Sequence, residues 1–147
     1  MEADQRVPVV AKSEIEIAGA PEAVWDVLTD FRAWPSWNPD VKSMSFAGEV
    51  AEGSEFKWKT GPGTIRSTIR RVERPRLIGW TGKTLGTTAV HVYRLEPRDG
   101  KTLVSTEESF GGLIARIFRG ALQKTVKKSL DTGLLYLKAR VEEPTER

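Results

Sequence analysis

The sequence predicts an α+β domain in which an antiparallel sheet is closed by one long C-terminal helix. From Val41 to Phe110, polar and apolar residues alternate with a period of two between turns rich in glycine and proline, which is typical of an antiparallel meander. Residues 113–143 contain no proline and repeat their apolar residues at the helical period, which predicts a long helix. The length of 147 residues suits a single domain.

The composition excludes several kinds of site. Hydrophobic residues make up 39% and charged residues 29% of the chain, which is not the composition of a disordered segment. The absence of cysteine removes disulfides and thiolate metal sites, and the single histidine removes a multi-histidine metal site. No nucleotide-binding motif is present. We therefore expect no metal and no cofactor.

The first part of the chain is expected to form one strand and two short helices. Residues 13–17 alternate between polar and apolar and predict a half-buried strand, after a loose tail over residues 1–11. Pro21 suits the first turn of a helix, because the missing N–H has no helical partner there. Residues 30–39 are rich in aromatic residues and predict a second short helix that ends before Pro39.

About six further strands are expected before the long helix. Gly61–Gly63 and Pro97–Gly100 indicate tight turns, and the second is a strong hairpin signal. The long helix is expected to begin at Leu113. It could bend at a kink near Gly120 or Gly133. The strands are expected around Met44–Phe46, Phe56–Trp58, Ile65–Ile69, Leu77–Thr81, Val90–Leu95 and Val104–Phe110.

Four stretches of the sequence carry a family resemblance. They are residues 20–31 (APEAVWDVLTDF), residues 34–39 (WPSWNP), the hairpin from Leu95 to Glu108, and the segment from Ser129 to Lys138. Together they resemble the START-like, or SRPBCC, superfamily, in its branch of polyketide cyclases, dehydrases and lipid-transport proteins. The resemblance implies the helix-grip fold: a seven-stranded curved antiparallel sheet wrapped around the C-terminal helix, with a cavity between them.

The resemblance also implies domain boundaries and a class of ligand. A single START-like ligand-binding domain is expected over residues 12–143, between a flexible N-terminal tail and a C-terminal tail over residues 144–147. The ligand would be a lipid or a polyketide-like molecule. No catalytic motif of the family matches this sequence, because such folds host binding, transport and catalysis with different pocket residues.

The side chains that face the cavity can be predicted from the alternation along each strand. Leu95 and Val104 flank the hairpin and are apolar, so their faces are expected to point inward. Trp80 is included although Leu77 and Ile78 leave the inward face of its strand ambiguous. The strand residues expected to bind the ligand are Phe56, Trp58, Ile65, Ser67, Ile69, Trp80, His91, Tyr93, Thr106, Glu108 and Phe110.

Small residues recur every four positions on the long helix. The stripe consists of Ala121, Thr125, Ser129 and Gly133. One interpretation is close packing of the helix against the sheet. The other is that small side chains leave room for a ligand, to which Thr125 and Ser129 would offer hydroxyls. The helix residues expected to contact the ligand are Phe118, Ala121, Leu122, Thr125 and Ser129.

Three polar residues of the expected inward face could support catalysis. His91 titrates near neutral pH, and Glu108 is expected on an adjacent strand as its carboxylate partner. Tyr93 could donate a hydrogen bond to a ligand carbonyl. These residues suggest an alternative function, a cyclase or dehydratase. The competing interpretation is that His91 is a structural strand residue and Glu108 pairs with a basic neighbour.

The tryptophans and the basic residues each allow two interpretations. Trp25, Trp34 and Trp37 are expected to pack the short helices, but Trp34 and Trp37 could instead form a lid over the pocket. The basic residues of the long helix form either a solvated face or a surface for anionic headgroups or nucleic acid, which would make the chain a non-catalytic interaction protein. They are Arg116, Arg119, Lys124, Lys127 and Lys128.

The sequence therefore favours a protein that binds a hydrophobic small molecule in a cavity between sheet and helix. That cavity should exceed about 300 Å³, the usual lower size of a ligand pocket. The mixed charge of +3 gives no reason to expect nucleic acid. No apolar run is long enough for stable membrane insertion, and the N-terminus lacks a signal-peptide core. We expect a cytoplasmic monomer or homodimer.

Overall fold

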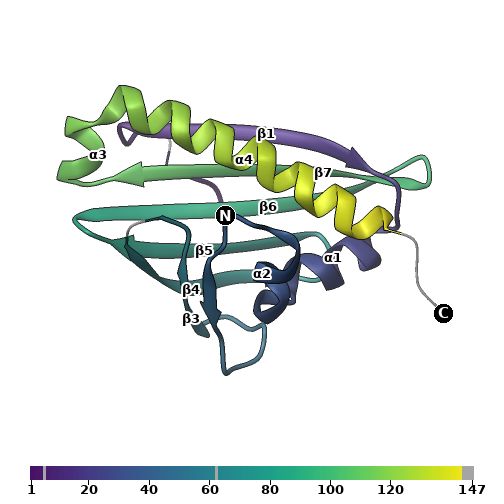
Figure 1. Cartoon of the computed structure of the whole chain (residues 1–147). Helices are drawn as coiled ribbons and strands as arrows, with labels where there is room; N and C mark the ends of the chain where they lie inside the picture. The colour runs from purple at the N-terminus through teal and green to yellow at the C-terminus, as the bar shows by residue number, and fades with distance from the viewer. Residues whose placement is uncertain (5, 62, 144–147) are drawn as a thin grey trace.

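The computed structural model describes residues 1–4, 6–61 and 63–143 of the chain. Seven antiparallel strands form one curved sheet in the order β1-β7-β6-β5-β4-β3-β2, and the C-terminal helix α4 crosses it (Figure 1). The expected helix-grip fold is thereby confirmed. The expected tail over residues 144–147 lies outside the described residues, as does Pro62 of the predicted turn.

The first three helical elements follow β1, and the other two follow the remaining six strands. The helical elements are α1 (Pro21–Thr29), η1 (Phe31–Ala33), α2 (Trp34–Trp37), α3 (Leu113–Ile117) and α4 (Arg119–Glu142). The strands are β1 (Val9–Ile17), β2 (Ser43–Ser45), β3 (Glu55–Lys59), β4 (Thr64–Glu73), β5 (Leu77–Thr84), β6 (Thr87–Arg98) and β7 (Lys101–Gly111).

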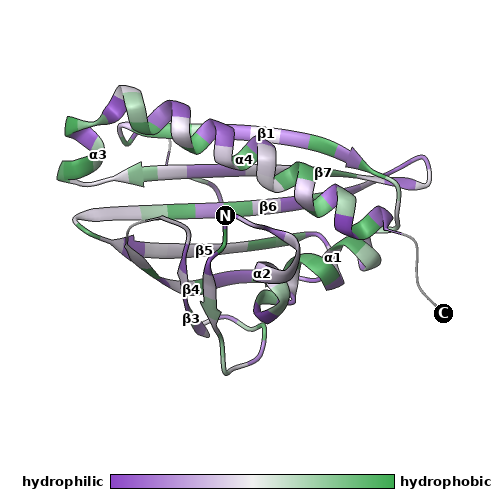
Figure 2. Cartoon of the chain, in the orientation of Figure 1, coloured by the Kyte–Doolittle hydropathy of each residue, from purple (hydrophilic) through white to green (hydrophobic). Residues whose placement is uncertain are grey.

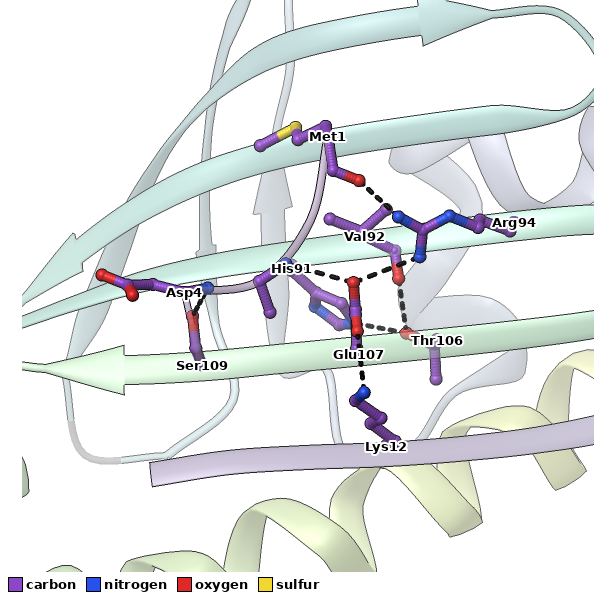
Figure 3. A network of polar contacts seen from close by, with 10 residues as sticks. Met1, Asp4, Lys12, His91, Val92, Arg94, Thr106, Glu107 and Ser109 are labelled. Carbon is purple, nitrogen blue, oxygen red and sulfur yellow. Dashed lines mark hydrogen bonds and ion pairs between the residues drawn. The ribbon is translucent and has the colours of Figure 1, made fainter. Parts of the chain in front are cut away.

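The N-terminal part of the chain differs from the expected loose tail. Strand β1 begins at Val9, because Val9 and Ala11 are buried in a small apolar cluster with residues of α4. Before β1, the chain lies across the outer face of the sheet (Figure 3), where the backbone N–H of Ala3 donates to Glu107 at 3.1 Å. The backbone N–H of Asp4 donates to Ser109 at 3.0 Å. These residues therefore belong to the fold.

The long C-terminal helix is interrupted once. Helix α3 ends at Ile117, and α4 begins at Arg119, because Phe118 leaves the helical conformation (φ −103°, ψ 28°). A β-branched residue before Phe118 and Gly120 after it both have low helix propensity. The interruption therefore lies close to the first of the two predicted kink sites, whereas α4 continues through Gly133.

An aromatic cluster fills one end of the concave face of the sheet. The ring of Phe31 lies at its centre, 4.6 Å from the ring centroid of Phe56 and 4.9 Å from that of Trp34. Trp34 is 5% exposed, and its indole N–H donates to the carbonyl of Leu28 at 2.8 Å. Trp25 is buried in the same core. The packing interpretation therefore describes Trp25 and Trp34 correctly.

Helix α4 covers the free edge of the sheet. Strand β1 is an edge strand, so its outer backbone groups have no neighbouring strand, and an exposed edge of this kind is prone to aberrant pairing. Polar side chains of α4 bind those groups instead, in sequence order along both elements. The contacts are Gln123 with Val10, Lys127 with Lys12, Lys138 with Glu16 and Glu142 with Ala18.

The central position of Phe31 makes a prediction about stability. Phe31→Ala should lower the free energy of unfolding by about 3–5 kcal/mol, because it leaves a void among close-packed rings. Urea denaturation would measure this change. The matched control is Phe118→Ala, which removes an equal side chain that is 57% exposed and should cost about 0.5 kcal/mol or less. Equal losses for the two variants would contradict the assignment of Phe31 to the core.

Candidate functional site

A cavity of about 190 Å³ lies between α4 and the concave face of the sheet. Its wall combines the inner faces of the central strands, one side of α4, and the segment that follows α1. The lining residues are Leu28, Trp34, Trp37, Asn38, Asp40, Val41, Trp58, Thr60, Ile65, His91, Tyr93, Glu108, Phe110, Leu122, Thr125, Val126, Ser129, Leu130 and Gly133.

The structure brings most of the predicted site residues to this cavity. Nine of the sixteen line it: Trp58, Ile65, His91, Tyr93, Glu108, Phe110, Leu122, Thr125 and Ser129. Ser67 and Trp80 lie beside it, on a second hollow of only about 20 Å³. Trp80 points inward together with Ile78, which resolves the ambiguous face of β5.

Five predicted residues lie elsewhere. Phe56 and Ile69 point inward but are enclosed in the aromatic core, and Thr106 is buried behind His91. Phe118 is 57% exposed, and Ala121 is also exposed to solvent, so neither faces the cavity as expected. Phe118 lies at the interruption between the two helices, and Ala121 lies on a side of α4 that faces solvent.

The small-residue stripe of α4 borders the mouth of the cavity. Thr125, Ser129 and Gly133 line the cavity, and both Thr125 and Ser129 are also exposed to solvent. A residue that borders a cavity and solvent together stands at its rim. The stripe therefore lies at the opening and is not packed closely against the sheet.

The rest of the cavity wall comes from residues to which the period of two along the strands does not apply. Leu28 comes from α1, Thr60 follows β3, and Asn38, Asp40 and Val41 follow α2, where no period of two applies. Val126 and Leu130 face inward from α4, between the apolar cluster at β1 and the cavity. For these last two, the apolar flank beside the small-residue stripe was the signal that could have identified them.

A hydrogen bond at one ring nitrogen holds His91 in place. Its Nε2 lies 2.9 Å from the hydroxyl of Thr106, and that hydroxyl donates to the carbonyl of Val92 at 3.0 Å (Figure 3). The hydroxyl proton is thus used, so Thr106 accepts a hydrogen bond from His91 and Nε2 carries a proton. This contact fixes the orientation of the imidazole.

The other nitrogen of His91 faces a carboxyl group. Nδ1 lies 3.3 Å from Oε2 of Glu108, on the neighbouring strand β7. Both side chains are largely buried, and Nδ1 has no well-aligned hydrogen-bond partner among the described residues. Because Nε2 already carries a proton, Nδ1 and Glu108 can share one further proton. The pair can therefore release or accept a proton inside the cavity.

Tyr93 lies next to this pair. Its ring stacks on the imidazole of His91, with ring centroids 4.8 Å apart and an interplanar angle of 25°. Burial raises the pKa of Tyr93 well above its ordinary value, the charge of Glu108 raises this pKa further, and the hydrogen bond with Thr106 acts in the opposite direction. The phenol therefore stays protonated and remains a hydrogen-bond donor at neutral pH.

The indole groups of the two tryptophans in α2 differ. Trp34 uses its N–H within the protein, as described above, whereas Trp37 is only partly buried. The N–H of Trp37 is buried without a hydrogen-bond partner among the described residues. An indole N–H is a donor only and costs free energy when it is left unpaired. Trp37 therefore lines the cavity and carries a buried donor that has no partner among the described residues.

Two kinds of feature are absent from the described residues. No group of three or more His, Cys, Asp or Glu side chains is arranged to hold a metal ion. Likewise, none of the helices over residues 1–4, 6–61 and 63–143 is sufficiently long and apolar to cross a membrane.

The fold resembles solved structures at low sequence identity. A hypothetical protein of Helicobacter pylori, jhp0584, has a TM-score of 0.84 at 14% identity, over 94% of this chain and 90% of its own. A START superfamily protein of Mycobacterium smegmatis has a TM-score of 0.80 at 16% identity, over 92% and 99%. The protein TTHA0849 of Thermus thermophilus has a TM-score of 0.78 at 14% identity, over 90% and 96%.

The sequence comparisons agree with the structural ones. No protein with a curated description shows significant similarity to this sequence. The profile of one family, described as polyketide cyclase / dehydrase and lipid transport, matches residues 8–142. That match covers the sheet, the helices and every residue of the cavity wall. The fold is that of START-like proteins, and the chain belongs to the polyketide cyclase/dehydrase and lipid-transport family.

Proposed function

We propose that the cavity binds a small, mainly apolar molecule that carries at least one hydrogen-bonding group. The observation that carries this proposal is the composition of the cavity wall. Most of the wall is apolar or aromatic, yet it includes Trp37, whose N–H has no partner among the described residues, and His91, whose Nδ1 faces the carboxyl group of Glu108. Apolar walls with a few polar groups are typical of small-molecule sites.

The volume of the cavity limits the size of the molecule. About 190 Å³ is smaller than the expected lower size of about 300 Å³. An apolar cavity of about 150 Å³ is large enough for benzene. At this volume the cavity suits a molecule of about one aromatic ring. A lipid chain or a polyketide of several rings would require the rim formed by α4 and the segment after α2 to move outward.

The polar groups of the wall specify the chemistry of the ligand. Trp37 can only donate, so it favours a ligand oxygen that accepts a hydrogen bond. The protonated phenol of Tyr93 would be a second donor if it exchanged its hydrogen bond with Thr106 for one to the ligand, and the His91–Glu108 pair can accept one proton. A hydroxyl group both donates and accepts, so an aromatic alcohol satisfies these groups better than a hydrocarbon of the same shape.

This proposal predicts a preference between two probes of nearly equal shape. In an NMR titration, p-cresol should bind at least about tenfold more tightly than p-xylene, because the hydrocarbon leaves buried polar groups unpaired. Equal affinities would mean that the polar wall does not take part in recognition.

The same titration locates the bound probe with two glycine variants. Gly133 lines the cavity, and an added Cβ atom there meets no neighbouring atom within 4 Å, so Gly133→Leu should extend into the cavity and abolish binding. The control is Gly120→Leu, on the exposed start of the same helix, where an added Cβ atom also meets no neighbouring atom within 4 Å. Both replacements increase the helix propensity of α4, because leucine favours the helical conformation more than glycine does. Binding that survives in Gly133→Leu would overturn the proposal.

A second candidate function is proton transfer to a bound carbonyl compound. It is favoured by the His91–Glu108 pair, which can take up one proton inside the cavity next to Tyr93. In a cyclase or dehydratase reaction, the pair would remove a proton next to a carbonyl group while Tyr93 donates to the carbonyl oxygen.

This candidate predicts a measurable exchange reaction. The protein should accelerate the loss of deuterium from the methyl group of acetophenone in water, followed by NMR. Glu108→Gln and His91→Gln should each reduce the acceleration about 100-fold, since a positioned base contributes about 100-fold or more. The control is Ser129→Ala at the rim. No acceleration by the wild type, or equal rates in all variants, would reject proton transfer but leave ligand binding untouched.

The raised pKa of Tyr93 predicts the dependence of stability on pH. Below pH 10, the ordinary value, the phenol is protonated in both the folded and the unfolded chain. Above it the unfolded chain ionises first, so the free energy of unfolding should fall as the pH rises. Denaturation at pH 9 and pH 11 should show a smaller fall for Tyr93→Phe than for the wild type. Tyr136→Phe is the matched control, and an unchanged fall in Tyr93→Phe would contradict the burial of its phenol.

A further inference from the structure

Large apolar side chains are exposed together at one end of the molecule. Helix α3 and the residue after it contribute four of them, and the turn between β5 and β6 contributes one; Figure 2 shows the hydrophobic colouring of α3. We call this set the apolar tip. Its members, with their exposed fractions, are Leu85 (72%), Leu113 (68%), Ile114 (41%), Ile117 (61%) and Phe118 (57%).

The fold holds the apolar tip in an outward orientation. Ala115 is fully buried and anchors α3 on the sheet. The turn beside Leu85 packs directly against this helix, because a Cβ atom at Gly86 would lie 3.2 Å from Ile114. A Cβ atom at Gly112 would lie only 2.4 Å from the carbonyl oxygen of Gly86. A close contact between the backbone at Gly86 and the backbone at Gly112 therefore helps to hold the apolar tip in its exposed position.

The charged side chains of the segments that form and adjoin the apolar tip, residues 83–88 and 111–130, are all basic. Residues 111–130 contain five basic residues and no acidic residue. Among these, Lys127 forms an ion pair with Asp131 at 2.9 Å, one turn further along α4. On the other side of the tip, a shallow hollow beside Leu85 is lined by Arg66 and Lys83 together with threonine and glycine residues. The apolar side chains are thus flanked by cations on both sides.

We propose that the apolar tip docks on the surface of an anionic lipid bilayer. The apolar side chains would enter the boundary between headgroups and acyl chains, at a depth of about 5–10 Å, while Arg116 and Arg119 contact the headgroup phosphates. An apolar patch flanked by cations matches this layered chemistry, in which negative charge lies above hydrocarbon. The docking is peripheral, and it does not depend on which molecule occupies the cavity.

Two other partners fit the observations less well. A second copy of the chain, docked tip to tip, would bring like charges together, which opposes association. A nucleic acid would use the cations, but its phosphate backbone offers no apolar layer for Leu113, Ile117 and Phe118. Both partners remain distinguishable in the experiment.

The apolar tip adjoins the candidate site. Phe110 on the cavity wall precedes α3 by three residues, and Leu122 on the same wall lies one helical turn after Phe118. A membrane in contact with the tip would therefore lie close to the α3 end of the cavity. This position suits a protein that exchanges an apolar molecule with a bilayer.

The test is co-sedimentation with vesicles of phosphatidylcholine, with or without one quarter phosphatidylglycerol. The wild type should bind the anionic vesicles and not the neutral ones, and high salt should weaken binding. Leu113→Ser/Phe118→Ser should reduce partitioning at least about tenfold. Arg116→Gln/Arg119→Gln should reduce it roughly 30-fold, at about 1 kcal/mol per cation.

Matched controls separate the tip from general surface effects. Leu135→Ser removes a side chain that is 56% exposed on α4, outside the tip. Arg98→Gln/Lys101→Gln removes two charges at the β6–β7 turn, which lies at the opposite end of the sheet from α3 (Figure 1). Both controls should bind vesicles as the wild type does.

A fluorescent probe tests whether the tip enters the bilayer. Because the chain has no cysteine, Ile117→Cys and Leu135→Cys can each carry one polarity-sensitive fluorophore. The emission at position 117 should shift to the blue with anionic vesicles, while that at position 135 should not. Absence of vesicle binding, or binding that survives in the Leu113→Ser/Phe118→Ser variant, would overturn the proposal.

The alternative partners also have distinct outcomes. A dimer of the wild type that Leu113→Ser/Phe118→Ser dissociates, without vesicle binding, would identify the tip as an interface between copies. Binding to an oligonucleotide that depends on Arg116 and Arg119 but not on the apolar residues, again without vesicle binding, would identify a nucleic-acid surface. Either result would contradict docking on a bilayer.

Discussion

The attachment of α4 to the free edge of β1 is the contact on which the cavity depends. Side chains such as Gln123 and Lys138 bind backbone groups of that strand directly, so the helix axis follows the edge of the sheet. The cavity lies between α4, held in this position, and the central strands together with the segment after α2. The same hydrogen bonds also protect an edge that would otherwise be open to aberrant pairing.

Two separate apolar clusters define the walls of this gap. The larger one is built around the aromatic rings near Phe31, and the smaller one joins Val9 and Ala11 of β1 to α4. Each cluster contributes residues to the cavity, for example Leu28 from the first and Leu130 from the second. The polar group formed by His91 and Glu108 lies on the strands between them. A hydrogen-bonding group is thus surrounded by apolar walls, where electrostatic interactions are stronger than in water.

Alternation along the strands predicted the fold and much of the site. A period of two assigns each side chain to a face, and this suffices to bring His91, Tyr93 and Glu108 to one wall. It does not say how deep a residue lies, so Phe56 could not be separated from Trp58 in advance. The bulge near Arg70, where the register between β4 and β5 shifts, and the interruption at Phe118 depend on tertiary packing. The cavity volume depends on how the two apolar clusters fill their space, which no local pattern records.

The outer face of the sheet constrains the inner one. Glu107 is 8% exposed, and its carboxylate joins three elements: Arg94 of β6 at 3.1 Å, Lys12 of β1 at 3.8 Å and the N–H of Ala3 in the N-terminal segment (Figure 3). These contacts tie β1, β6 and the N-terminal segment to β7 on the face opposite the cavity, and so restrain the two strands that carry His91 and Glu108. If the cavity binds molecules of different size as proposed, we expect the helical side of the cavity to move and the geometry of the His91–Glu108 pair to be retained.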